Sequence, residues 1–167
     1  MTSEETDIER EIFIAAAPET VFRFLVDPTL MADWIGLTHT LEPRPGGVFR
    51  VEVSKGNVAR GVYTEVIPPR RVVFTWGWES APSGEPWAAV PAGSSVVEID
   101  LEAKEAGTLL RLRHRRLPSS SSEMHGERWA GYLSRLAAAA PGTRPLEQVQ
   151  PTEAGGRQCA RRSYDKR

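Results

Sequence analysis

Several common protein classes find little support in this sequence. Cys159 is its single cysteine, so an internal disulfide is excluded and a reducing compartment is favoured. No apolar run approaches the roughly 20 residues that span a bilayer, and the polar start Met-Thr-Ser-Glu-Glu lacks the basic and apolar pattern of a signal peptide. We therefore expect a cytoplasmic protein without a membrane span.

A strong charge of either sign is also missing. The 21 basic and 22 acidic side chains give a net charge of −1. Because nucleic-acid binding requires a concentrated basic surface, we expect no nucleic-acid partner. The motifs G-x-S-x-G, the P-loop and G-x-G-x-x-G are absent, and His39, His114 and His125 lack the spacing of metal ligands. The sequence thus predicts no metal site and implies no cofactor.

What is present is a succession of periodic segments. Alternating apolar residues predict a strand over residues 8–14, and apolar residues at helical spacing predict short helices before Asp27 and over residues 28–36. A long helix over residues 118–140, capped by Ser121 or Ser122, is expected at the end. Between the helices, alternation and turn residues predict six strands: 37–43, 47–53, 57–67, 71–80, 95–105 and 107–117.

This order of elements predicts an α+β protein. Strands joined by short turns form a mostly antiparallel sheet, and the long helix has to bury its apolar stripe against that sheet. A curved sheet wrapped around the helix would leave a cavity suited to a small apolar ligand. The predicted domain covers residues 8–140, between an N-terminal extension (1–7) and a flexible tail (141–167) in which basic side chains outnumber acidic ones by six to three.

A set of motifs distributed along the chain carries a family resemblance. They are Trp34 in the second short helix, Arg44-Pro45-Gly46-Gly47, Gly61 with Glu65, Pro68-Pro69, and Thr75-Trp76. In combination they resemble the activator of heat-shock protein 90 ATPase homologue-like family of the START/Bet v 1-like (SRPBCC) superfamily, over about residues 8–138.

The resemblance implies the helix-grip fold and a cavity for hydrophobic ligands between sheet and helix. Some superfamily members are cyclases or dehydratases that act on polyketide-like rings. The namesakes of the family stimulate a chaperone ATPase, but their chaperone contacts also use other regions. Two departures from the family pattern affect the expected cavity shape: Trp34-Ile35 replaces the usual tryptophan pair, and Arg128 replaces the glycine before Trp129.

The stretch Phe74-Thr75-Trp76-Gly77-Trp78-Glu79 places three large rings on one strand face. We expect Phe74 to be core, and Trp76 and Trp78 to face the last helix as core or as cavity wall, near a lid formed by residues 81–94. The predicted ligand-binding residues are Trp34, Phe49, Tyr63, Trp76, Trp78, Trp87, His114 and Trp129.

Glu65 and His114 are the weak catalytic candidates. His114 lies in phase with Leu110 and Leu112 and should face inward, either as a core histidine or as a cavity acid or base. Glu65 shares a predicted strand face with Tyr63, and the orientation of that strand is ambiguous. The sequence thus predicts binding of a small hydrophobic or aromatic ligand, without strong catalysis. The alternatives are a co-chaperone-like ATPase activator with a protein partner, and a polyketide cyclase- or hydrolase-like enzyme.

Overall fold

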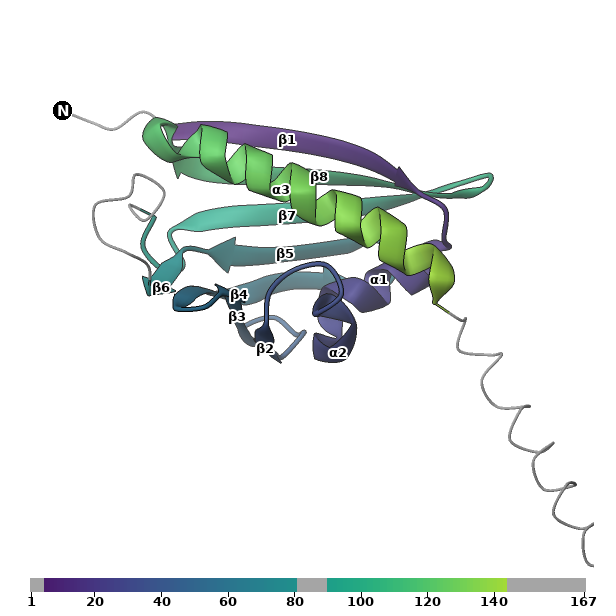
Figure 1. Ribbon diagram of the computed structural model, residues 1–167, viewed down its shortest axis with the longest axis horizontal. Coiled ribbons are helices and arrows are strands. Elements are labelled where there is room, and N and C mark those ends of the chain that lie inside the picture. Colours follow the sequence, from purple (N-terminus) through teal and green to yellow (C-terminus); the bar gives the residue numbers. More distant parts are fainter. Residues whose placement is uncertain (1–4, 81–89, 144–167) are drawn as a thin grey trace, which may run out of the picture.

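An antiparallel sheet of eight strands, crossed on one face by a long helix, dominates the computed structural model (Figure 1). Residues 5–80 and 90–143 are described. Trp87, most of the predicted lid and most of the predicted tail lie outside these residues. The strands are β1 (Glu5–Ile14), β2 (Thr38–Leu41), β3 (Val48–Ser54), β4 (Asn57–Ile67), β5 (Arg71–Trp76), β6 (Trp78–Ser80), β7 (Ser95–Lys104) and β8 (Gly107–Pro118).

The described residues also form three α-helices: α1 (Pro18–Val26), α2 (Pro28–Met31) and α3 (Ser119–Ala139), the last followed by the 3₁₀ turn η2 (Ala140–Gly142). The strand order is β1-β8-β7-β5-β4-β3-β2, with β6 paired to β4. Helix α3 runs over β1 and β8, and its end reaches α1 (Figure 1). We call the sheet face that it covers the inner face. The predicted helix-grip architecture is confirmed, and no helix in the described ranges is long and apolar enough to cross a membrane.

The alternation predicted for the first strand is confirmed, although β1 begins at Glu5 rather than at residue 8. Ile8, Ile12 and Ile14 pack toward the core, while Glu9, Glu11 and Phe13 are exposed. Arg10 lies on the inner side as well, and its guanidinium passes over Gly126 of α3. The edge strand and the long helix therefore pack closely at this glycine.

The predicted strand 71–80 is in fact two strands, β5 and β6, separated at Gly77. A Cβ at Gly77 would overlap the carbonyl oxygen of Pro91, so the returning chain passes directly against this residue. The Trp78 N–H donates to the Val90 carbonyl at 2.7 Å. Gly77 thus permits a close backbone approach, which is a recognised reason for glycine inside a strand.

The prediction that Tyr63 and Glu65 share a face is wrong. Tyr63 pairs with Phe74, but Glu65 pairs with Val73, so the register shifts between them. Such a bulge adds one residue and reverses the alternation that follows it. Tyr63 is fully buried on the inner face, whereas the side chain of Glu65 is 43% exposed on the outer face.

Two helix predictions also need correction. Helix α2 ends at Met31, well before Gly36, because a tight turn follows in which the Trp34 N–H donates to the Met31 carbonyl at 3.0 Å. Helix α3 has no side-chain cap. Ser121 Oγ and Ser122 Oγ instead donate to backbone carbonyls three residues earlier, each at 3.0 Å. A hydroxyl that donates in this way leaves the free N–H groups of the first turn to other partners.

Gly61→Ala should lower the free energy of unfolding by roughly 1–3 kcal/mol, the range for overpacking a filled site. Its Cβ would overlap the Thr75 carbonyl oxygen, and backbone atoms cannot swing away as a flexible side chain can. Gly131→Ala is the matched control, because this exposed position of α3 has nothing within 4 Å of a new Cβ. The control should raise stability by about 0.5–1 kcal/mol. Urea unfolding of both variants checks this, and wild-type stability of Gly61→Ala would contradict the packing.

Candidate functional site

The aromatic side chains of the inner face form two groups. The first lies toward α1 and contains Phe49, whose ring stacks on Phe74 with centroids 4.0 Å apart. Trp34 Nε1 donates to the Phe24 carbonyl at 2.9 Å, and the Tyr63 hydroxyl donates to the Leu25 carbonyl at 3.2 Å.

These bonds use the polar atoms of two predicted ligand residues. Carbonyls in the last turn of a helix have no partner within the helix, so Trp34 and Tyr63 satisfy the end of α1. Burial also raises the pKa of the Tyr63 phenol well above its usual range, which keeps it neutral. The polar atoms of Trp34 and Tyr63 are therefore used in hydrogen bonds within the protein.

The second group, which we call the indole–imidazole cluster, lies between the sheet and α3. It consists of Trp76 of β5, Trp78 of β6, His114 of β8, and His125 and Trp129 of α3. All five side chains are less than 10% exposed. The Trp76 centroid lies 5.3 Å from that of Trp129 and 5.5 Å from that of Trp78, and the two imidazole centroids are 5.4 Å apart. The prediction that Trp76 and Trp78 face the last helix is confirmed.

Hydrogen bonds define the tautomer of His114. Trp129 Nε1 donates to His114 Nδ1 at 2.9 Å, so Nδ1 carries no proton. The proton must then reside on Nε2, which lies 2.7 Å from Ser95 Oγ and donates to it. The Ser95 hydroxyl in turn donates to the Trp76 carbonyl at 2.9 Å. A continuous chain of donors therefore runs from α3 through β8 and β7 to β5.

His125 has the opposite tautomer for the same reason. Trp78 Nε1 donates to His125 Nε2 at 3.2 Å, so the proton resides on Nδ1, which donates to the Ser121 carbonyl at 2.8 Å. Each imidazole thus accepts one indole proton and donates its own. Protonation of either ring would make its accepting nitrogen a donor. That nitrogen would then face the N–H of an indole, and two donors facing each other are unfavourable in a buried site.

Burial and charge act on the histidine pKa values in the same direction. Burial lowers the pKa of His114 well below its usual value, and the nearby His125 lowers it further. Burial also lowers the pKa of His125; its bond to Ser121 opposes this shift, and the charge of Arg128 adds to it. Both rings are therefore neutral at pH 7.

One polar atom of the cluster has no such partner. Among the buried side-chain nitrogen and oxygen atoms of the described ranges, only Trp76 Nε1 has no hydrogen-bond partner. Trp76 itself is 2% exposed. A buried unsatisfied donor is uncommon in folded proteins, because leaving it without a partner costs free energy.

The weak catalytic candidates are not brought together. His114 faces inward, as predicted, and is fully buried. Glu65 lies on the outer face, where it accepts from Arg71 Nε at 3.0 Å. Ser95 and His114 form a serine–histidine contact, but His114 Nε2 is the donor and so cannot accept the serine proton as a general base does.

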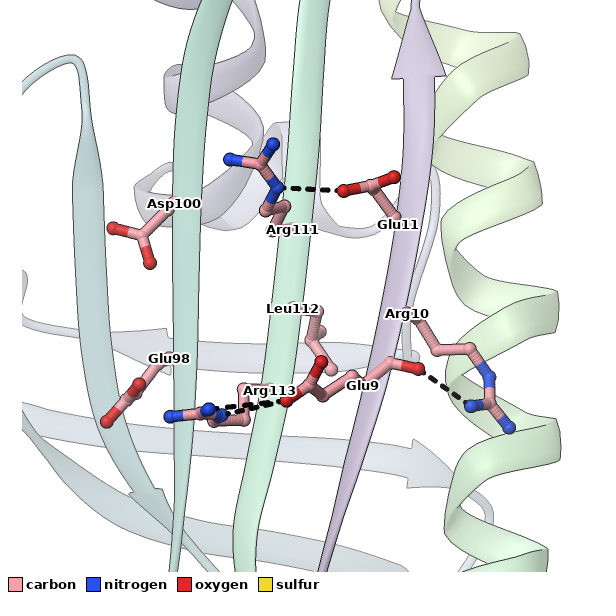
Figure 2. Close-up of a pocket in the computed structure, with 8 residues that line it drawn as sticks. All are labelled: Glu9, Arg10, Glu11, Glu98, Asp100, Arg111, Leu112 and Arg113. Atoms are coloured by element: carbon pink, nitrogen blue, oxygen red, sulfur yellow. Dashed lines mark hydrogen bonds and ion pairs between the residues drawn. The ribbon is translucent and has the colours of Figure 1, made fainter.

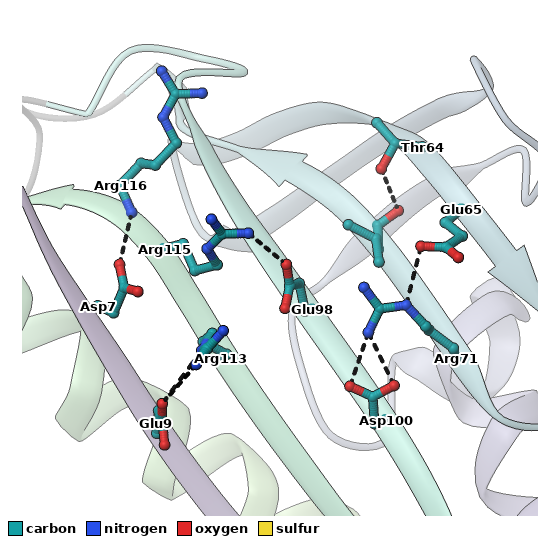
Figure 3. A network of polar contacts seen from close by, with 11 residues as sticks. Asp7, Glu9, Thr64, Glu65, Arg71, Glu98, Asp100, Arg113, Arg115 and Arg116 are labelled. Atoms are coloured by element: carbon teal, nitrogen blue, oxygen red, sulfur yellow. Dashed lines mark hydrogen bonds and ion pairs between the residues drawn. The ribbon is translucent and has the colours of Figure 1, made fainter.

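The outer face is covered by charged side chains of neighbouring strands. Figure 3 shows Arg71 between Glu65 and Asp100, and Arg115 beside Glu98. Arg115 Nη1 lies 2.7 Å from Glu98 Oε2. A pocket of about 440 Å³ lies on this face and not between the sheet and α3 (Figure 2). Its lining consists largely of charged side chains from three adjacent strands: Glu9 and Glu11, Glu98 and Asp100, Arg111 and Arg113.

These charges already neutralise one another. Arg111 lies 2.7 Å from Glu11, and Arg113 lies 3.2 Å from Glu9. Exposed pairs of this kind contribute little to stability, because water screens them. The outer pocket therefore does not fit a hydrophobic ligand. Within the described ranges, no group of three histidine, cysteine, aspartate or glutamate side chains could hold a metal ion.

Sequence reasoning missed two members of the inner polar arrangement, His125 and Ser95. A signal existed for both. His125 lies four residues before Trp129 and four after Ser121, on the buried stripe of α3. Ser95 is in phase with Val97 and Ile99, which are fully buried on β7. Their bonding partners lie on other elements, so the spacing indicates burial but not the contact.

A long helix held against a curved antiparallel sheet, with an aromatic interior, defines the class of START-like helix-grip proteins. Residues 15–140 match the family "Activator of Hsp90 ATPase homolog 1-like protein". The chain belongs to this family. No curated protein matches it.

Solved structures give the same result. An AHSA1-like protein from Rhizobium etli is 41% identical, with 85% of this chain and 86% of that one covered and a TM-score of 0.65. A protein from Mesorhizobium loti is 21% identical over 84% of this chain and all of its own, with a TM-score of 0.71. An Aha1 dimer from Colwellia psychrerythraea is 20% identical over 81% and 96% of the two chains, with a TM-score of 0.66. The last two are similar in fold.

Acid should destabilise the protein through the two histidines. In the unfolded chain their pKa is about 6.5, and in the folded chain it is lower. The unfolded state thus binds more protons below pH 6.5, so stability is complete above this pH and falls below it. Each histidine contributes up to about 1.4 kcal/mol per pH unit. Urea unfolding between pH 5 and pH 8 measures the slope.

His114→Gln is the variant that tests the origin of this slope. Its amide can donate to Ser95 without titrating, so the loss of stability between pH 6.5 and pH 5 should become smaller. Phe13→Leu, an exposed substitution outside the cluster that changes no titratable group, should retain the loss. An unchanged slope in His114→Gln would show that His114 does not titrate with folding.

Proposed function

We propose that this chain binds a small hydrophobic or aromatic molecule between the inner face of the sheet and α3, and that it is not a strong catalyst. The observation that carries the proposal is the indole–imidazole cluster, in which polar atoms are gathered between sheet and helix and one buried donor is left without a partner. Ligand sites combine apolar and aromatic walls with a few polar groups in this way. The family fold is consistent with such a role.

The proposed binding residues are those of the cluster, with Trp76, Trp78 and Trp129 as aromatic walls and His114 among the polar groups. Trp34, Phe49 and Tyr63 support them from the α1 side, where their contacts are with α1 and with other rings. Trp87 remains a sequence prediction. The absence of strong catalysis rests on the tautomer of His114 and on the outward position of Glu65.

Native mass spectrometry of freshly purified protein tests the proposal. We expect a small molecule that stays bound under native conditions and is released on denaturation. The neutral fluorescent probe 1-aminoanthracene should bind as well, and binding should weaken in Trp78→Phe, which removes the bond to His125. Phe13→Leu is the matched control, because Phe13 is 48% exposed on the outer side of β1 and should not affect binding.

Two outcomes would contradict the proposal. If neither an adduct nor probe binding is found, the interior is a closed core. If Phe13→Leu weakens the probe as much as Trp78→Phe does, the probe binds elsewhere. The family description also fits a protein partner, so stimulation of a chaperone ATPase by the purified chain should be measured in parallel. Stimulation without any bound molecule would favour the co-chaperone reading.

A further inference from the structure

The indole–imidazole cluster has one hydrogen-bond donor without a partner in the described part of the chain, while the accepting nitrogens of its imidazoles are both bonded. Of its three indole N–H groups, two are bound, since Trp129 donates to His114 and Trp78 donates to His125. The third, on Trp76, is buried without a partner among the described residues. The accepting nitrogens of both imidazoles are thus occupied by protein donors, while one donor is available.

We infer that the ligand is a neutral, flat aromatic molecule with a hydrogen-bond acceptor, such as a ring ketone, and that the acceptor binds the Trp76 N–H. This inference rests on the proposed function and specifies the chemistry of its ligand. A molecule with only an acceptor satisfies the free indole. A molecule that brings a donor finds the imidazole acceptors occupied, and a buried donor without a partner is costly.

The walls of the cluster also favour a neutral aromatic body. Trp78 and Trp129 are the indoles next to Trp76, and they offer faces and edges on which a planar ring can pack. Both imidazoles are neutral, so the cluster itself provides no charge to balance an anion.

Trp78 is the most exposed of the three indoles of the cluster. It lies on the three-residue strand β6 and is 7% exposed, compared with 2% for Trp76 and 2% for Trp129. This side of the cluster is therefore nearest to solvent, and a ligand that reaches Trp76 from it must leave the bond between Trp78 and His125 in place.

Three probes of similar shape test the inference: fluorene, which has no acceptor; 9-fluorenone, which has one; and 9-fluorenol, which has a donor as well. We expect 9-fluorenone to bind roughly 3- to 10-fold more tightly than fluorene, the effect of one neutral hydrogen bond. 9-Fluorenol should bind more weakly than 9-fluorenone. In Trp76→Phe, which keeps an aromatic ring but removes the N–H, the preference for 9-fluorenone should disappear while fluorene binding changes less.

Nuclear magnetic resonance of the indole N–H groups gives a direct signal in the wild-type protein. The Trp76 resonance, identified by its loss in Trp76→Phe, should shift downfield with 9-fluorenone and much less with fluorene. If Trp76→Phe does not fold, the Trp76 resonance of the wild-type protein can be assigned from its contacts with neighbouring residues. The difference between its shifts with 9-fluorenone and with fluorene then tests the inference.

The outcomes separate this inference from the proposed function. Equal affinity for fluorene and 9-fluorenone, with no selective shift of the Trp76 resonance, would overturn the inference that a ligand acceptor binds the Trp76 N–H. The proposal that the protein binds an aromatic ligand would remain. Binding of none of the three probes, together with no binding of 1-aminoanthracene, overturns both.

Discussion

The arrangement of the interior depends on one hydrogen bond, from Trp129 Nε1 of α3 to His114 Nδ1 of β8, at 2.9 Å. It joins the long helix to the sheet at a fully buried position, and it decides which nitrogen of His114 carries the proton. That choice makes His114 a donor to Ser95, and Ser95 a donor to the backbone of Trp76. A single indole proton thus orients the whole chain of donors and also prevents His114 from acting as a base toward Ser95.

The same residue types have different roles on the two sides of the inner face because their partners differ. Near α1, Trp34 and Tyr63 meet carbonyls that a helix end leaves free, and their polar atoms are used to fix that helix. Under α3, Trp78 meets an imidazole of the helix. Trp76 lies between these regions and meets mainly ring surfaces, so its N–H is left without a partner.

The two faces of the sheet contribute unequally to stability. The outer face pairs arginines with carboxylates across adjacent strands, as in the contacts of Arg71 (Figure 3), and each exposed pair adds little. The inner face buries large aromatic side chains, each of which removes roughly 150–250 Å² from water. Family membership fixes the fold that separates these faces, but the chemistry of a site has to be argued from its own side chains.

Local patterns in the sequence were sufficient for the order of the elements, the antiparallel sheet and the inward position of His114, because alternation and helical spacing report which side of an element is buried. The orientation of Glu65 and the contacts inside the cluster depended on strand register and on the placement of α3. The bulge that turns Glu65 outward adds one residue and leaves no mark on local periodicity. The contact between Trp78 and His125 joins residues 47 positions apart, and the isolation of the Trp76 N–H is a property of all its neighbours together. Such contacts exist only after the helix is packed on the sheet, so tertiary structure alone decided them.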